Sequence, residues 1–144
     1  YLQRLEAGGL VAALPEFGDG WSAGNAAFRL VLRDNALLPA GAEVPLERRV
    51  RNACLAHAVE SGRVPRFWRD GPLEVDAITD AGRRRQLLVI RLGAVEPASL
   101  AGVLALCGRL PSHHPLLVGD AAGKASADHA DIDWMDWREF LLSG

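Results

Sequence analysis

Carboxylates and a guanidinium group occur at regular spacing on two neighbouring apolar segments of the chain. Glu74 and Asp76 stand two residues apart within residues 73–79, and Arg91 lies in residues 87–92, a run rich in branched side chains. Side chains two residues apart lie on one face of a strand. Carboxylates gathered on one face can hold Mg²⁺, whereas a carboxylate beside a guanidinium group forms an ion pair. Whether these residues form a metal site or an ion pair depends on the segments that position them.

Residues 73–93 are predicted to form a β-hairpin. Asp80-Ala81-Gly82 separates the two apolar runs and supplies the residues of a turn. We place Asp76 opposite Arg91, and directly opposed residues share one face of a sheet. This register predicts a polar face with Glu74, Asp76, Arg91 and Gly93, and an apolar face with Leu73, Val75, Leu88, Ile90 and Leu92.

The hairpin resembles the PD-(D/E)XK nuclease superfamily, which has the restriction-endonuclease-like fold. In that family an acid on the first strand and a Glu on the second hold a divalent cation, and a Lys two residues further on acts on the attacking water. Asp76 matches the first acid, but Arg91 occupies the Glu position and Gly93 the Lys position. A guanidinium group cannot ligate a metal, and glycine has no side chain. The resemblance therefore implies the fold and speaks against the chemistry.

The segments that flank the hairpin follow the order that this resemblance implies. An amphipathic helix is expected before it, and Glu47 at its start matches the auxiliary acid of the family. The expected elements are helices at 46–61, 99–110 and 136–142, and further strands between the first helix and the hairpin, at 115–120 and at 131–134. They predict an α/β protein with a restriction-endonuclease-like three-layer α/β/α core and a central mixed sheet.

The chain divides into two parts at residue 44. Residues 45–144 are assigned to the nuclease-like α/β domain, and residues 1–44 to an N-terminal extension or the tail of a preceding domain. Within residues 1–44 we expect a helix over 1–14, a Gly-rich loop over 16–25 and a strand over 26–34. No apolar run approaches the roughly 20 residues that cross a membrane.

The two cysteines are expected to be free thiols. Cys54 and Cys107 lie on separate predicted helices, and two cysteines in a chain of this length do not form a disulfide framework. Cys54 and His57 stand one helical turn apart and could form a nucleophile pair, but a core cysteine beside a surface histidine is the expected arrangement. Free thiols fit a cytoplasmic location.

Positive charge is concentrated in the middle of the chain, although the net charge is −2. Residues 48–91 hold ten arginines and five acids, and the segments on both sides are acidic. If the basic block gathers on one face, it attracts phosphate groups; otherwise it is a solvated face with mixed ion pairs. The candidate nucleic-acid-binding residues are Arg48, Arg49, Arg51, Arg83, Arg84 and Arg85.

Asp76 and Arg91 are expected to form a cross-strand ion pair in which the arginine replaces the charge of the lost cation. The alternative is a residual metal site formed by Glu47, Glu74 and Asp76, which would hold Mg²⁺. We assign no catalytic residue, no metal site and no cofactor to the chain.

The function expected from these observations is that of a non-catalytic nuclease-like module. It would bind DNA or RNA weakly, or scaffold a protein partner or other domains of a longer chain, in a nucleic-acid-processing or defence system, without contacting a membrane. One alternative is an active metal-dependent nuclease whose missing carboxylate has moved. A second alternative is an unrelated small α/β protein-interaction domain. Metal-dependent cleavage would distinguish the active nuclease from the other two possibilities. Nucleic-acid binding would distinguish the non-catalytic module from the protein-interaction domain.

Overall fold

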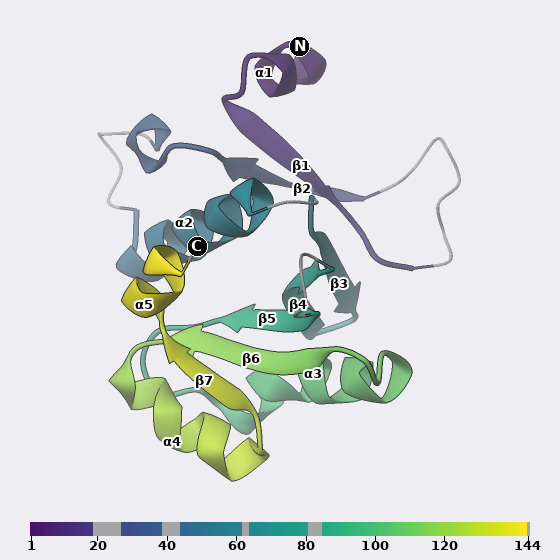
Figure 1. The fold of residues 1–144 in the computed structure, drawn as a ribbon, viewed down its shortest axis with the longest axis vertical. Coiled ribbons are helices and arrows are strands. Elements are labelled where there is room, and N and C mark those ends of the chain that lie inside the picture. The colour runs from purple at the N-terminus through teal and green to yellow at the C-terminus, as the bar shows by residue number, and fades with distance from the viewer. Residues whose placement is uncertain (19–26, 39–43, 62–63, 81–84, 144) are drawn as a thin grey trace.

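The computed structural model describes residues 1–18, 27–38, 44–61, 64–80 and 85–143. These residues form a mixed α/β structure with a five-stranded mixed sheet and a separate two-stranded sheet (Figure 1). The elements are α1 (Leu2–Ala7), β1 (Val11–Pro15), β2 (Phe28–Leu32), the short 3-10 helix η1 (Asn35–Leu37), α2 (Leu46–Glu60), β3 (Arg66–Asp70), β4 (Leu73–Thr79), β5 (Gln86–Ile90), α3 (Pro97–Arg109), β6 (His114–Gly119), α4 (Ala121–Ala130), β7 (Asp133–Asp136) and α5 (Trp137–Leu142).

The large sheet combines an antiparallel half with a parallel half. Its strand order is β3-β4-β5-β6-β7, with β3, β4 and β5 antiparallel and β5, β6 and β7 parallel. Gly71, at φ +56°, begins the two-residue turn between β3 and β4, where glycine carries no steric penalty. The parallel strands are joined through α3 and α4, because parallel neighbours need a crossover connection.

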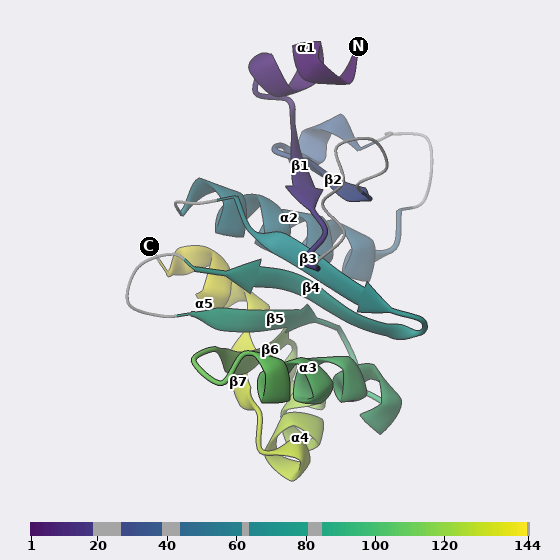
Figure 2. The same ribbon diagram turned by 90° about the vertical axis from the view of Figure 1, so that its right-hand side faces the viewer.

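Helices cover both faces of the large sheet (Figure 2). On one face, α2 and α5 pack on Leu88 and Ile90 of β5, together with buried residues of β1 and β2. On the other face, α3 and α4 pack on Leu87 and Val89 of the same strand. Residues 87–90 are therefore all buried, as expected for a strand covered on both sides. None of the described helices is long and apolar enough to cross a membrane.

The predicted hairpin forms, but its register differs from the expected one. The strands β4 and β5 are antiparallel neighbours, with Ala77 opposite Leu88, so Asp76 does not lie opposite Arg91. In addition, β5 ends at Ile90, before Arg91. The expected apolar face is also wrong, because Val75 packs towards α3 whereas Leu88 and Ile90 pack towards α2.

A β-bulge in β4 accounts for the change of face. Arg66 pairs with Ile78 and Trp68 pairs with Val75, so β4 contains one more residue than β3 across this interval. An extra residue shifts the alternation of side chains, and so Val75 and Ile78 both reach the α3 side. Asp76 and Ala77 lie between them, and the carboxylate of Asp76 reaches arginines of β2 and α2 on the opposite side.

Elsewhere the expected helices at 46–61 and 99–110, the strand at 115–120 and the terminal helix are confirmed. The expected helix over 1–14 is wrong after Ala7, because Gly9 adopts φ +68° and Val11–Pro15 form a strand whose side chains enter the core. The helix α4 was not expected. Its N-cap is Asp120, whose carboxylate accepts a hydrogen bond from the Ala122 N–H at 3.1 Å. The expected turn residues 81–82 and most of the 16–25 loop lie outside the described residues.

Candidate functional site

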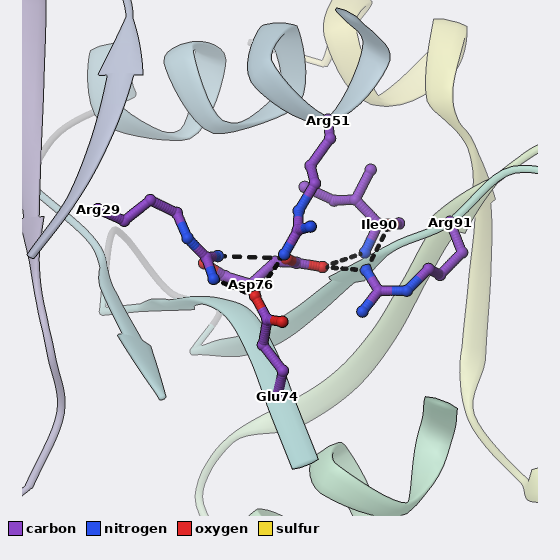
Figure 3. A network of polar contacts seen from close by, with 6 residues as sticks. All are labelled: Arg29, Arg51, Glu74, Asp76, Ile90 and Arg91. Atoms are coloured by element: carbon purple, nitrogen blue, oxygen red, sulfur yellow. Dashed lines mark hydrogen bonds and ion pairs between the residues drawn. The ribbon is translucent and has the colours of Figure 1, made fainter. Parts of the chain in front are cut away.

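Asp76 lies at the centre of a cluster of arginine side chains (Figure 3). The residue is completely buried. Its Oδ2 accepts hydrogen bonds from the Ile90 backbone N–H at 2.8 Å and from Arg91 Nη1 at 2.7 Å. Its Oδ1 accepts a hydrogen bond from Arg29 Nη1 at 3.3 Å and forms an ion pair with Arg51. Both carboxylate oxygens are therefore occupied by donors.

Glu74 is the second carboxylate of this cluster, and its side chain is 25% exposed. Its Oε1 forms ion pairs with Arg29 and with Arg51, so these two arginines bridge both acids. The cluster thus contains three guanidinium groups and two carboxylates, which leaves an excess of one positive charge.

The three arginines come from separate segments of the chain. Arg29 extends from β2, Arg51 from α2 and Arg91 from the residue that follows β5. The Arg29 guanidinium carbon lies 4.9 Å from the centre of the Phe67 ring, which adds a cation–π contact. Arg91 Nη1 also donates a hydrogen bond to the Ile90 carbonyl at 2.6 Å. The strand β2 of the two-stranded sheet, the helix α2 and the large sheet all meet at Asp76.

Asp76 and Glu74 stabilise the charged form of Arg51. Burial lowers the pKa of the Arg51 guanidinium, but the charges and hydrogen bonds of Asp76 and Glu74 outweigh burial and raise this pKa above its ordinary value. The Nε of Arg51 is buried and has no hydrogen-bond partner among the described residues. The guanidinium group of Arg51 therefore lies beside the two carboxylates that the alternative Mg²⁺ site would use.

The expected pair of Asp76 and Arg91 forms, although the two residues are not opposite each other. Glu47, in contrast, is exposed in the first turn of α2 and makes no salt bridge with a described residue. Gly93 adopts φ +79°, and its N–H lies 3.1 Å from both carboxylate oxygens of Asp120. The described residues contain no group of three or more His, Cys, Asp or Glu side chains that could hold a metal.

The candidate nucleic-acid-binding arginines do not form one group. Arg48 and Arg49 are exposed near the start of α2, whereas Arg51 faces the carboxylates. Arg85 donates a hydrogen bond to Ser112 Oγ at 3.2 Å. Arg83 and Arg84 lie outside the described residues. Sequence reasoning missed Arg29, because nothing in the spacing of the arginines indicates a contact 47 residues along the chain.

A cavity of about 560 Å³ opens between β2 and α2, directly beside the cluster. It combines arginines with leucines on its walls. The lining residues are Arg29, Leu30, Leu32, Leu38, Arg48, Arg51, Asn52, Leu55 and Glu74.

Cys54 and His57 do not form a nucleophile pair. Burial, together with the negative charge of Asp76, raises the pKa of the Cys54 thiol from an ordinary 9.0 to about 12. The Nε2 of His57 instead lies 2.8 Å from the Ser143 carbonyl oxygen, and its ring contacts Phe140 edge-on. At neutral pH the Cys54 sulfur is therefore a protonated thiol in the core.

Cys54 is expected to resist alkylation in the folded protein, whereas the partly exposed Cys107 reacts first. The thiolate, not the thiol, attacks iodoacetamide and displaces iodide, and the raised pKa keeps Cys54 protonated until the pH approaches about 12. Raising the pH from 7 to 9 should therefore accelerate modification at Cys107 and leave Cys54 unmodified, as followed by peptide mass spectrometry. Urea should expose both thiols equally. Modification of Cys54 before Cys107 in the native protein would contradict the burial of its sulfur.

Comparisons with known proteins do not assign the chain to a family. No protein-family model, no curated protein and no solved structure matches it. A function is therefore proposed below from the structure, above all from the arrangement of charges around Asp76 and the cavity beside it.

Proposed function

We propose that this chain is a catalytically silent nuclease-like module that binds nucleic acid within a nucleic-acid-processing or defence system. The observation that carries the proposal is the occupation of both Asp76 carboxylate oxygens by arginine side chains and the Ile90 N–H. The order of helix, three antiparallel strands, crossover helix and parallel strand supports a restriction-endonuclease-like fold, as the resemblance of the hairpin implies.

Metal-dependent hydrolysis is disfavoured by the charge of the cluster. A divalent cation needs free carboxylate oxygens, and it generates the attacking nucleophile in this type of chemistry. To bind Asp76, the cation would have to displace Arg91 from one oxygen and Arg29 and Arg51 from the other. The same guanidinium groups repel it. Gly93 adds no side chain that could act on a water molecule.

Binding of phosphate groups is favoured by the same charges. The cluster has one more positive than negative charge, and Arg48 and Arg49 are exposed on the adjoining turns of α2. Arginine pairs with phosphate through two parallel hydrogen bonds. Few arginines are exposed there, so the binding should be weak, and it should decrease with salt by a small slope because few phosphates are contacted.

The test combines a cleavage assay with a binding assay on the same protein. Single- and double-stranded DNA and RNA are incubated with Mg²⁺, Mn²⁺ or a chelator, and binding is followed by fluorescence anisotropy at 50 and 200 mM salt. We expect no cleavage under any condition and binding that weakens at the higher salt concentration.

Two results would contradict the proposal in different ways. Metal-dependent cleavage that disappears in Asp76→Ala, at a temperature where circular dichroism shows the variant to be folded, would establish an active nuclease with a relocated carboxylate. Absence of binding to every nucleic acid at low salt would favour a protein-interaction domain.

A further inference from the structure

The cavity between β2 and α2 has the size and the lining of a ligand site. Its volume of about 560 Å³ lies within the range of small-molecule pockets, roughly 300–1,000 Å³. Its lining contains arginines, here called the basic wall (Arg29, Arg48 and Arg51), and leucines, here called the apolar wall (Leu30, Leu32 and Leu38). Both reach the surface because Arg48 and Leu30 are exposed. A ligand that fits both walls carries negative charge on one side and an apolar body on the other.

The basic wall contains arginines with two different roles. Arg29 and Arg51 are held by ion pairs with Glu74 and Asp76, so their positive charge has a fixed position. Arg48 stands three residues before Arg51, on the same side of α2, and makes no ion pair among the described residues. The guanidinium group of Arg48 can therefore turn to a ligand without losing such a pair.

The apolar wall is fixed to the same helix by Asn52. The side-chain amide of Asn52 accepts a hydrogen bond from the Leu32 N–H at 3.0 Å and donates one to the Leu32 carbonyl at 2.8 Å. It thereby takes the place of a neighbouring strand at the edge of β2. Leu30, which is 50% exposed, stands two residues earlier on β2. The distance between the leucines and the arginines is thus set by the fold.

We propose that this cavity binds one nucleotide of a single strand, with its phosphate at Arg48 and its base on Leu30 and Leu38. This inference rests on the nucleic-acid binding proposed above and names the form of nucleic acid that is bound. A base in a duplex is stacked and paired, so its face cannot reach an apolar wall inside a cavity. An unpaired base offers both faces, and its phosphate supplies the anion that a guanidinium group binds through two hydrogen bonds.

The test measures binding of a labelled oligothymidylate and of a duplex of equal length by fluorescence anisotropy at one low salt concentration. The variants are Arg48→Glu and Leu30→Ser, both at exposed positions, with thermal melts to verify folding. Arg109→Glu is the matched control, because Arg109 is an exposed arginine at the end of a helix on the other face of the sheet.

We expect the wild type to prefer the single strand, and Arg48→Glu to weaken that binding by about ten-fold, as loss of a charged hydrogen bond does. Leu30→Ser should weaken single-strand binding but leave duplex binding unchanged, and Arg109→Glu should stay within about two-fold of the wild type, since it lies far from the cavity.

Three outcomes would overturn the inference. If the wild type binds nucleic acid but neither Arg48→Glu nor Leu30→Ser changes the affinity, the cavity is not the site, although the proposed function stands. If inorganic phosphate displaces the oligothymidylate as well as thymidine monophosphate does, the cavity binds an anion without a base. If the wild type binds no nucleic acid, the inference and the proposed function fail together.

Discussion

Replacing Asp76 by alanine should destabilise the protein by about 3–5 kcal/mol, because loss of one partner leaves buried charges without compensation. Arg29 and Arg51 would keep only Glu74, Arg91 would lose its one carboxylate partner among the described residues, and the Ile90 N–H would lose its acceptor. The free energy of unfolding, measured by urea denaturation followed by circular dichroism, gives the change directly.

Two further variants test whether the loss of stability in Asp76→Ala comes from the ion pairs of the cluster. Arg91→Ala should cost less than Asp76→Ala, because Arg29, Arg51 and the Ile90 N–H still contact the carboxylate. Asp70→Ala removes an exposed aspartate at the end of β3 and should change the free energy of unfolding by less than about 0.5 kcal/mol, as is usual at the surface. An Asp76→Ala protein as stable as Asp70→Ala would mean that the ion pairs contribute nothing to stability.

The sequence predicts the hairpin and the contact of Asp76 with Arg91, but not the register that produces this contact. Register can be read from a strand when one face is polar and the other apolar. Both faces of the large sheet are covered by helices here, so residues 75–79 and 87–90 are all buried and show no alternation. The bulge between Val75 and Ile78 cannot be predicted from a segment whose side chains are buried on both faces.

The positions of Arg29 and Arg51 could not be predicted, for a different reason. Fifteen arginines are present in the chain, and their spacing alone does not indicate which of them face a carboxylate. The family resemblance drew attention to Glu47 on the helix at 46–61, and the helix is confirmed. Arg51 stands one turn further along the helix, and it is this residue that reaches Asp76. The helix was thus predicted correctly, but the side chain that it brings to Asp76 is a guanidinium group and not the carboxylate of Glu47.

The missed elements α4 and β1 are short segments with weak sequence patterns. Residues 121–130 are rich in alanine and bury only Gly123 and Ala127, so they lack the apolar stripe of a typical amphipathic helix. The leucines at positions 2, 5, 10 and 14 have helical spacing, but Gly8 and Gly9 interrupt the helix. Beyond this interruption, burial of Val11, Ala12 and Leu14 favours a strand.

Gly119→Ala should destabilise the protein by about 1–3 kcal/mol, the usual cost of inserting a methyl group into a packed core. Gly119 is the last residue of β6, and a Cβ atom there would collide with the Arg91 carbonyl oxygen. That oxygen belongs to the backbone, so relief of the collision requires movement of the end of β5. The measurement is again urea denaturation.

Gly108→Ala is the matched control, because a Cβ at this position in α3 meets no atom within 4 Å. It should leave stability unchanged or raise it by about 0.5–1 kcal/mol, the difference in helix propensity between the two residues. Equal stability of Gly119→Ala and the wild type would contradict the close approach of β5 and β6.

The effect of Gly119→Ala should depend on Asp76. The segment that must move carries the Ile90 N–H and the Arg91 side chain, which both bind the Asp76 carboxylate. Part of the destabilisation by Gly119→Ala is therefore the loss of these contacts with Asp76. In an Asp76→Ala background the contacts are already absent, so this part no longer contributes. A double-mutant cycle should give a combined destabilisation smaller than the sum of the single effects by at least about 0.5 kcal/mol. Strict additivity would show that the packing of β6 does not position Arg91 at the carboxylate.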